Sequence, residues 1–371
     1  MTVTDPATAP FLLMTPGPTR VPERVLRAGA RAMMHHRSPE FSAELAVMLE
    51  LLGPVFGTTH PVLPVHTTGR GAMEATVCNL FSSGDEIAVC CNGSFGEMWA
   101  RLAVSYGLVV HRIVADWARS VDPGEVDAFL SGHPGVRAVA IAYCDTSTGV
   151  RNDVAAVCKV ARAHNVLALV DAVSALAGMP FAFDEWEADV AITASQKCLM
   201  SSPGLAFAVL SERAWAANAT ARLTRNYWDF AAIRNAVTKP RPDTPGTTPV
   251  HLVLQVAESL RMLHEEGLVN VQRRHEEIAT ATRTGARRLG LPLLFPDLQQ
   301  LSPTVTALAV PPGVGPRAVR DEIKARGILT AAAIGKYETS GFRIGHMGDI
   351  RLADVERTLA ALGEALTAAL A

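Results

Sequence analysis

The sequence is poor in the features that would place a protein in a membrane, on nucleic acid or in an oxidising compartment. Its 371 residues include six cysteines, and apart from the adjacent pair Cys90 and Cys91 they are scattered without CxxC spacing, which argues against a disulfide framework and against zinc. No uninterrupted apolar segment reaches the roughly 20 residues that span a bilayer, and residues 1–6 show no pattern of a secretory signal. The net charge is −2 without a basic stripe. We therefore expect a cytoplasmic protein with reduced thiols that has neither a membrane nor a nucleic acid as its partner.

The sequence does contain many hydrophobic residues, and they follow a regular order. They make up 49% of the chain, which is enough for a large buried core and for two domains. Short runs that are apolar on both faces alternate with helical patterns, and this alternation predicts an α/β domain with a mostly parallel sheet between helices. The predicted strands are Glu86–Cys90, Leu108–Ile113, Arg137–Tyr143, Val166–Val170, Ala188–Ile192 and Leu205–Leu210. The predicted helices between them are Gly71–Phe81, Glu97–Tyr106 and Asp153–Ala163, with Asn152 as the N-cap of the last.

The pattern changes after about residue 245, where longer helices and fewer strands predict a smaller α+β domain. Two long helices, Val250–Glu266 and Val269–Leu289, are interrupted at Gly267. They are followed by a predicted strand, Thr304–Val310, and by predicted helices Pro316–Arg326 and Leu352–Leu370. We divide the chain into an N-terminal arm of residues 1–20, a large domain of residues 21–265 and a small C-terminal domain of residues 266–371.

Polar residues capable of chemistry follow the predicted strands at their carboxyl ends, where ligands bind in open parallel sheets. Lys197 follows one buried strand, and Asp171 ends another. Three further clusters follow other apolar runs: residues 66–71, residues 92–96 and residues 145–149. Taken alone, each has a simple structural explanation, since such a lysine is usually a solvated rim residue and such an aspartate often caps a helix. Together they favour a ligand site, because all five fall at the same edge of one predicted sheet.

The ordered set of motifs resembles the class V aminotransferases of pyridoxal-phosphate fold type I, in particular the alanine–glyoxylate and serine–pyruvate (or serine–glyoxylate) group. The resemblance extends almost from end to end. It rests on residues 15–19, 36–41, 69–75, 147–150, 170–174, 195–197 and 341–348. It implies a large domain with a mostly parallel seven-stranded sheet, pyridoxal 5'-phosphate as the cofactor, and a ping-pong transfer of an amino group from alanine or serine to glyoxylate or pyruvate.

The resemblance also implies roles for individual residues. Lys197 would carry the cofactor as an aldimine and move the proton at the substrate α-carbon, while Asp171 would pair with the pyridinium N–H. Phe95 would stack on the ring and Arg343 would bind the substrate carboxylate. The remaining cofactor contacts implied by the family pattern are Thr146 at the ring 3-oxygen, and Thr68, Gly69, Arg70 and Gln196 at the phosphate, with Thr247 reaching the phosphate of a neighbouring subunit. We therefore expect a homodimer with shared active sites.

Several positions depart from the family pattern and leave the substrate open. Thr244 stands where a tyrosine is frequent, Arg70 where histidine is frequent, and residues 331–337 replace a loop that often carries a Gly-Gly pair. Arg37 would either border the partner's site or form a structural ion pair. Same-fold alternatives are amino transfer from 2-aminoethylphosphonate, ureidoglycine or aspartate, and a lyase or decarboxylase reaction. Cysteine desulfuration is disfavoured, because the 173 residues after Cys198 contain no cysteine.

Overall fold

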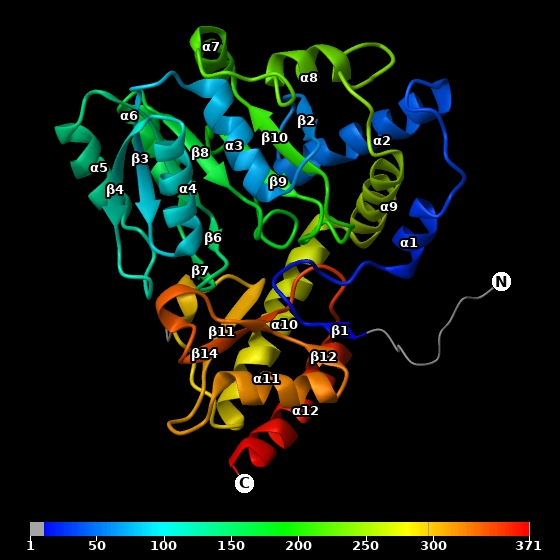
Figure 1. The fold of residues 1–371 in the computed structure, drawn as a ribbon, viewed down its shortest axis with the longest axis vertical. Coiled ribbons are helices and arrows are strands. Elements are labelled where there is room, and N and C mark those ends of the chain that lie inside the picture. The colour runs from blue at the N-terminus through cyan, green and yellow to red at the C-terminus, as the bar shows by residue number, and fades with distance from the viewer. Residues whose placement is uncertain (1–10, 296, 371) are drawn as a thin grey trace.

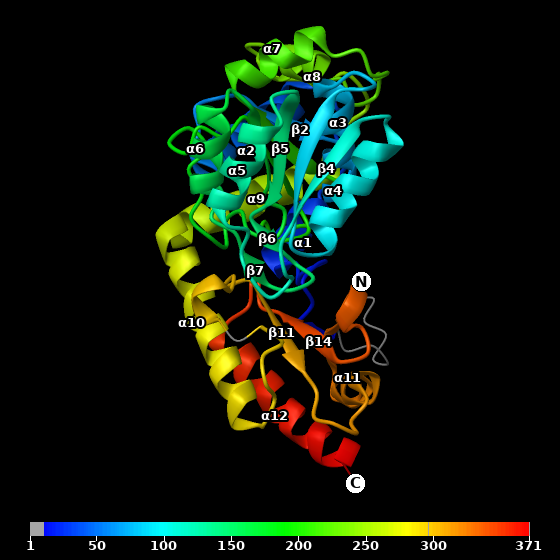
Figure 2. The same cartoon turned by 90° about the vertical axis from the view of Figure 1, so that its left-hand side faces the viewer.

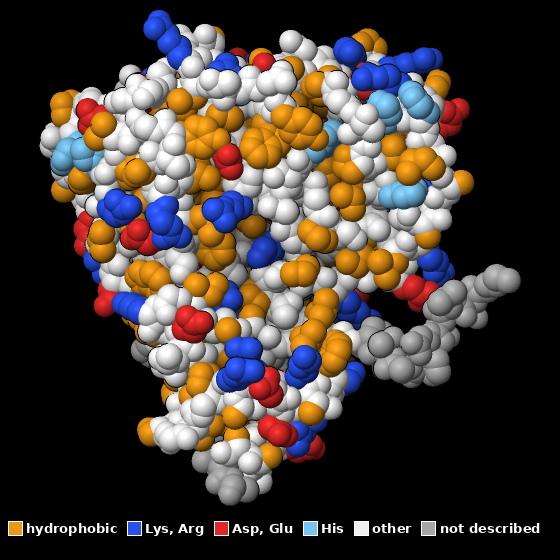
Figure 3. All heavy atoms as spheres, in the orientation of Figure 1, with side chains coloured by type: hydrophobic (Ala, Val, Ile, Leu, Met, Phe, Trp, Pro, Cys, Tyr) orange, Lys and Arg blue, Asp and Glu red, His pale blue; other side chains and the backbone are white. Residues whose placement is uncertain are grey.

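The computed structural model describes residues 11–295 and 297–370. Figures 1 and 2 show a broad part built on a central sheet and a narrower part beneath it, with the long helix α10 (Leu268–Arg288) running alongside the narrower part. None of the helices in these ranges is long and apolar enough to cross a membrane. On the face drawn in Figure 3, acidic, basic and apolar side chains are interspersed.

A seven-stranded sheet forms the centre of the larger part, as the family resemblance implies. Its strands lie in the order β2-β10-β9-β8-β5-β3-β4, and all neighbouring pairs are parallel except the two that involve β10. Their bounds are β2 Val62–Val65, β3 Glu86–Cys91, β4 Val109–Val114, β5 Val136–Ala142, β8 Leu167–Asp171, β9 Val190–Ala194 and β10 Ala206–Leu210. The short strand β2 was not among the predicted strands, because four residues with a central proline give little periodic signal.

Helices cover both faces of this sheet, and a separate apolar cluster lies under each layer. One cluster includes buried side chains of α2 (Pro39–Phe56), α5 (Pro123–Gly132), α6 (Val154–Ala163) and α9 (Val250–Glu266). The other includes side chains of α3 (Gly69–Leu80), α4 (Ser94–Ser105), α7 (Glu212–Thr220) and α8 (Phe230–Val237). Strands buried between two such layers must be apolar on both faces, which explains the continuous hydrophobic runs of the sequence.

The N-cap predicted for α6 is wrong by one residue. Asp153 is the cap, and its carboxylate accepts a hydrogen bond from the backbone N–H of Ala156. Asn152 is instead buried, where its amide donates to the backbone oxygen of Ala142 at 2.7 Å and its oxygen accepts from Asn92 at 2.8 Å. Asn and Asp are both good caps, and the tertiary contacts of Asn152 decide between them.

The narrower part combines helices with two short sheets. A three-stranded antiparallel sheet has the order β11-β14-β13 (Val305–Ala309, Gly341–Gly345 and Ala331–Ala332), and β1 (Leu12–Leu13) pairs in parallel with β12 (Ile328–Leu329). The remaining elements of the chain are α1 Glu23–Gly29, β6 Cys144–Asp145, β7 Val150–Arg151, α11 Pro316–Ala325, α12 Leu352–Leu370, and the short 3-10 helices η1 Leu298–Gln300 and η2 Gly335–Tyr337. The helical conformation is interrupted between α9 and α10 at Gly267, which has φ +84°, as predicted. The domain limits at residues 20 and 265 stay predictions.

Candidate active site

A cavity of about 190 Å³ lies beyond the carboxyl ends of the parallel strands. It is lined by eight of the predicted site residues, Thr68, Gly69, Arg70, Phe95, Thr146, Asp171, Gln196 and Lys197. They come from the start of α3, the first turn of α4, the segment after β5, the end of β8 and the turn after β9. The expectation that these sequence clusters meet at one edge of the sheet is therefore met.

Lys197 lies in the turn after β9 and is held against the N-terminal arm. Its Nζ donates a hydrogen bond to the backbone oxygen of Pro16, while its own backbone oxygen accepts from the Thr19 hydroxyl at 3.0 Å. The pKa of Lys197 is lowered to about 8, first because burial penalises the charged amine and second because the Arg343 guanidinium adds a like charge. A substantial share of this amine is therefore neutral, and able to act as a nucleophile or a base, at neutral to mildly alkaline pH.

The glycine at position 17 lets the N-terminal arm come this close. Gly17 has φ +106°, and a Cβ placed there would lie 2.6 to 2.7 Å from Cδ, Cε and Nζ of Lys197. A side chain would therefore face both a disfavoured backbone conformation and the end of the lysine.

Asp171 is the last residue of β8, and its carboxylate is buried. Its Oδ1 accepts from the backbone N–H of Val173 at 2.9 Å, and its Oδ2 accepts from the indole N–H of Trp99 at 3.4 Å. Burial raises the pKa of Asp171 to about 6, although both hydrogen bonds act in the opposite direction. The ionised carboxylate is thus costly unless a cation or another donor reaches it from the cavity.

The start of α3 offers free donors to the same cavity. Its N-cap, Thr68, makes no side-chain capping hydrogen bond, and the first N–H groups of a helix have no partner within the helix. Gly69 packs against Val173, whose side chain would lie 2.9 Å from an added Cβ. The side-chain oxygen of Gln196 is buried without a hydrogen-bond partner among the described residues. The free helical N–H groups suit a phosphate or another anion, whereas the unpaired Gln196 oxygen needs a donor.

Arg343 reaches the site from β14 in the narrower part. Its Nε donates to the backbone oxygen of Ala332 at 2.9 Å and its Nη1 to that of Thr146 at 2.8 Å, and no carboxylate among the described residues pairs with it. Burial lowers the pKa of Arg343 to about 10, which still leaves it cationic near neutral pH. Arg343 is not among the residues that line the cavity, but it donates to the backbone of Thr146, which does line it, so the guanidinium lies next to the cavity wall.

Thr247 lies outside this cavity. It is exposed in a separate hollow of about 570 Å³ that also contains Met33, His35 and His36. The contact of Thr247 with a neighbouring subunit stays a prediction. Thr244, by contrast, is buried, and its hydroxyl contacts Thr248 and the backbone oxygen of Gly246. Arg37 forms an ion pair with Asp243 at 2.6 Å, as a structural role requires, and a position of Arg37 beside the partner's site stays a prediction.

The structure gives roles to residues that the sequence analysis left without one. Asp145 is fully buried and accepts backbone hydrogen bonds from Phe95 at 2.8 Å and Gly96 at 3.3 Å, so it anchors the first turn of α4. Trp99 and Ser174 contact Asp171 and Thr146, respectively. The helical spacing from Phe95 to Trp99 places both on one face of α4 and was the available signal.

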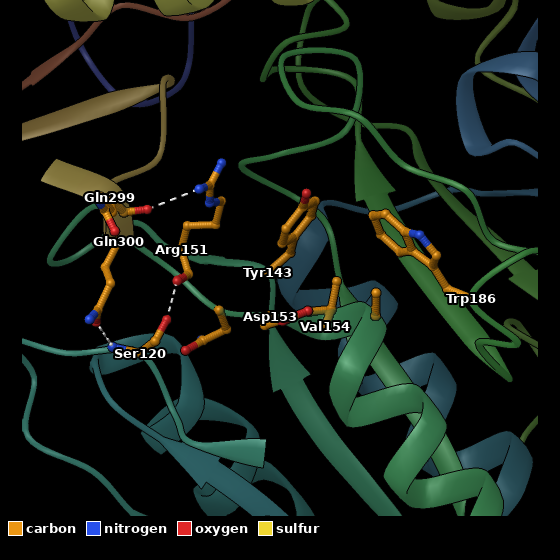
Figure 4. A pocket seen from close by; sticks show the side chains of 10 residues that line it. Ser120, Tyr143, Arg151, Asp153, Val154, Trp186, Gln299 and Gln300 are labelled. Carbon is orange, nitrogen blue, oxygen red and sulfur yellow. Dashed lines mark hydrogen bonds between the residues drawn. The ribbon is translucent and has the colours of Figure 1, made fainter. Parts of the chain in front are cut away.

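A second cavity, of about 410 Å³, lies between the two parts of the molecule (Figure 4). Figure 4 shows Arg151 directed toward Gln299, with Tyr143 and Trp186 on the opposite side. The Tyr143 hydroxyl donates to the backbone oxygen of Pro180 at 3.0 Å, and burial raises its pKa to about 12. This cavity contains none of the predicted site residues.

The residues of the smaller cavity fit pyridoxal phosphate. A lysine with a lowered pKa suits an aldehyde, and a buried carboxylate that lacks a cation suits a pyridinium N–H. The start of α3 suits the phosphate, and the half-buried Phe95 suits the ring face.

The family profile and the named aminotransferases among the similar proteins agree with this fit, whereas one similar protein is named as a hydrogenase subunit. The sequence profile of the family described as aminotransferase class-V matches residues 12–337. The chain is 39% identical over 356 residues to a protein named as the small subunit of a soluble hydrogenase from Synechococcus sp. (strain PCC 6716), covering 95% of this chain and 91% of that protein. It is 33% identical over 365 residues to the L-aspartate–glyoxylate aminotransferase of Paracoccus denitrificans, with coverage of 95% and 91%. The solved alanine–glyoxylate aminotransferase from Nostoc sp. superposes with a TM-score of 0.93 at 29% identity, covering 99% of this chain and 98% of that one.

Proposed function

The chain belongs to the class-V aminotransferase family, and we propose that it moves an amino group from alanine or serine to glyoxylate or pyruvate with pyridoxal 5'-phosphate as its cofactor. The observation that carries the proposal is that Lys197 and Asp171 line one cavity, with a lysine pKa of about 8. Glyoxylate as an acceptor is also supported by the names of the similar aminotransferases from Paracoccus denitrificans and Nostoc sp..

In this proposal each residue has a chemical task. When bound, the cofactor supplies an electron sink for the bonds of the substrate α-carbon. Lys197 takes the α-proton and returns it to complete the transfer, and a pKa near the working pH suits both steps. Asp171 keeps the ring nitrogen protonated, and the start of α3 holds the phosphate.

Substrate orientation and enclosure are assigned to the rest of the site. Arg343 binds the α-carboxylate by exchanging one or both of its backbone oxygen partners for substrate oxygens. Phe95 covers one face of the ring. We also propose a homodimer in which Thr247 of one subunit serves the site of the other.

Aspartate is a second candidate donor, because the aminotransferase of Paracoccus denitrificans is named for it. All three donors, alanine, serine and aspartate, are tested by one half-reaction screen. Each amino acid is added to the cofactor-loaded protein without any oxo acid, and the product is identified by mass spectrometry. We expect one equivalent of the matching oxo acid per subunit, from alanine, serine or aspartate. Release of carbon dioxide, ammonia or an aldehyde in its place would contradict amino transfer and favour a lyase or decarboxylase.

The reaction of Lys197 with the cofactor aldehyde should depend on pH. Only the neutral amine attacks a carbonyl, and the pKa of about 8 is lower than that of an ordinary lysine. We expect the rate of covalent attachment to rise about tenfold per pH unit below pH 8 and to level off above it. The measurement is borohydride quenching at timed intervals, followed by intact mass. A rate that keeps rising beyond pH 10 would mean that the pKa of Lys197 is not lowered.

Alanine at position 17 should lower both the stability of the protein and its affinity for the cofactor, whereas alanine at a control glycine, Gly313, should lower the stability alone. Gly17 has φ +106° and touches Lys197, whereas Gly313 has φ +85° and nothing within 4 Å of an added Cβ. Alanine at either position should cost about 1 to 2 kcal/mol of unfolding free energy. We expect Gly17→Ala alone to weaken cofactor binding, by about tenfold, because the lysine end must move. Equal cofactor affinity in the two variants would contradict a role of Gly17 in the site.

A further inference from the structure

We propose that Trp99 is a positioning residue that orients the Asp171 carboxylate toward the cofactor ring nitrogen. The inference rests on the proposed function, since it assigns Asp171 to that nitrogen. Trp99 does not line the cavity and would not touch the cofactor. It acts on Asp171 by donating its indole N–H to Oδ2 at 3.4 Å.

The contact is set by rigid elements on both sides. Asp171 ends β8, an interior strand of the sheet, and Trp99 lies on α4, which packs on β3 and β5. Both side chains are almost fully buried, with exposed fractions of 4% for Asp171 and 1% for Trp99. A buried indole needs an acceptor for its N–H, and for Trp99 the described residues provide the Asp171 carboxylate.

The two donors on Asp171 divide its acceptor capacity. Val173 donates to Oδ1 from the loop after β8, and Trp99 donates to Oδ2 from the facing helix. A carboxylate has about four lone-pair sites, so two fixed donors orient its plane and leave capacity toward the cavity. If the indole N–H is removed, the carboxylate can turn about its last side-chain bond, because the backbone donor alone does not fix its plane.

The position of α4 itself is controlled at its first turn. Asp145 accepts the N–H groups of Phe95 and Gly96, and a Cβ on Gly96 would collide with the backbone oxygen of Cys90. The helix is therefore pressed against β3 at the point where Phe95 enters the cavity. One turn further along the same face stands Trp99. A single helix thus presents the ring that would cover the cofactor and the donor that orients its carboxylate partner.

The electrostatics around Asp171 give this contact a measurable signature. The charged groups that act on Asp171 are Asp145, which favours its protonated form, and Lys197, which favours its ionised form. The indole N–H also favours the ionised form, so losing it should raise the pKa of Asp171 further above 6. A protonated Asp171 cannot stabilise a protonated ring nitrogen, and cofactor affinity should then fall at a higher pH than in the parent protein.

The test compares Trp99→Phe with Leu102→Ala as a packing control. Leu102 is also buried on α4 in the same apolar cluster, but it neither lines the cavity nor contacts Asp171. The affinities of the apo proteins are measured for pyridoxal phosphate and for its 1-deaza analogue, in which carbon replaces the ring nitrogen. We expect Trp99→Phe to weaken binding of pyridoxal phosphate about tenfold, with little effect on the analogue, and to shift the acidic limb of cofactor binding to higher pH. Leu102→Ala should affect both ligands equally.

A double-mutant comparison completes the experiment. If Trp99 acts through Asp171, then Trp99→Phe combined with Asp171→Asn should bind pyridoxal phosphate no more weakly than Asp171→Asn alone. The inference is overturned if Trp99→Phe weakens both ligands equally, if it has no effect, or if its effect adds to that of Asp171→Asn. A parent protein that binds neither ligand would instead contradict the proposed function. A parent that binds both equally would remove Asp171 from the ring nitrogen, and the inference would fall with that assignment.

Discussion

Replacing Lys197 by alanine is expected to reduce amino transfer by at least about 10⁴-fold and to abolish covalent attachment of the cofactor. The lysine supplies both the amine that holds the cofactor and the base that moves the α-proton, so no second group compensates for its loss. Lys197 is the only lysine among the residues that line the cavity, and the other cations near it are guanidinium groups, which neither attack aldehydes nor lose protons near neutral pH.

The measurement is intact mass after borohydride reduction, together with single-turnover rates of oxo acid formation. Lys159→Ala is the matched control, because this lysine lies exposed on α6, away from the cavity. The fold of Lys197→Ala should persist, since the change removes a buried cation whose pKa is already lowered by burial. Covalent attachment that survives in Lys197→Ala would place the reactive amine elsewhere.

The sequence predicts the fold well where the physical signal is local and repeated. Strands such as β9 and β10 are apolar on both faces, and long helices such as α9 begin and end at clear boundaries, so their positions follow from periodicity. The signal fails where tertiary contacts decide. Asn152 and Asp153 are equally good caps by type, and only the buried hydrogen bonds of Asn152 remove it from that role. Strand β2 is likewise defined by its pairing with β10 rather than by its own pattern.

The candidate site shows the same division. Lys197, Asp171 and Gly69 are visible in the sequence because each follows a strand or begins a helix at the edge where ligands bind. The contact of Gly17 with Lys197 is not visible, because it joins positions 180 residues apart through the fold of the N-terminal arm. The burial that shifts the pKa of Lys197 and Asp171 is also a property of the packed molecule.

Asp171→Asn is expected to lower amino transfer by about 10² to 10³-fold while making the apo protein more stable near pH 7. The rate falls because a neutral amide cannot hold the ring nitrogen in its protonated form. The stability gain follows from burial, which raises the pKa of this carboxyl from 3.8 to about 6. The folded protein therefore binds the Asp171 proton more tightly than the unfolded chain does, and stability is lost as the pH rises from about 4 through 6.

At pH 7 the ionised Asp171 carries the whole of this cost, about 3 kcal/mol for a shift of about two pH units. Asparagine avoids this cost. Its amide, however, directs an N–H at one of the donors, Trp99 or Val173, and this mismatch lowers the stability of the variant by about 1 to 2 kcal/mol. We expect a net gain of about 1 to 2 kcal/mol in apo unfolding free energy near pH 7 and no gain near pH 4, measured by denaturant titration. Added pyridoxal phosphate should reverse the order, because it stabilises the parent protein by binding its folded state. An apo variant that is less stable than the parent at pH 7 would show that the ionised Asp171 carboxylate is already stabilised within the apo protein. It would contradict our expectation that this carboxylate is costly until the cofactor binds.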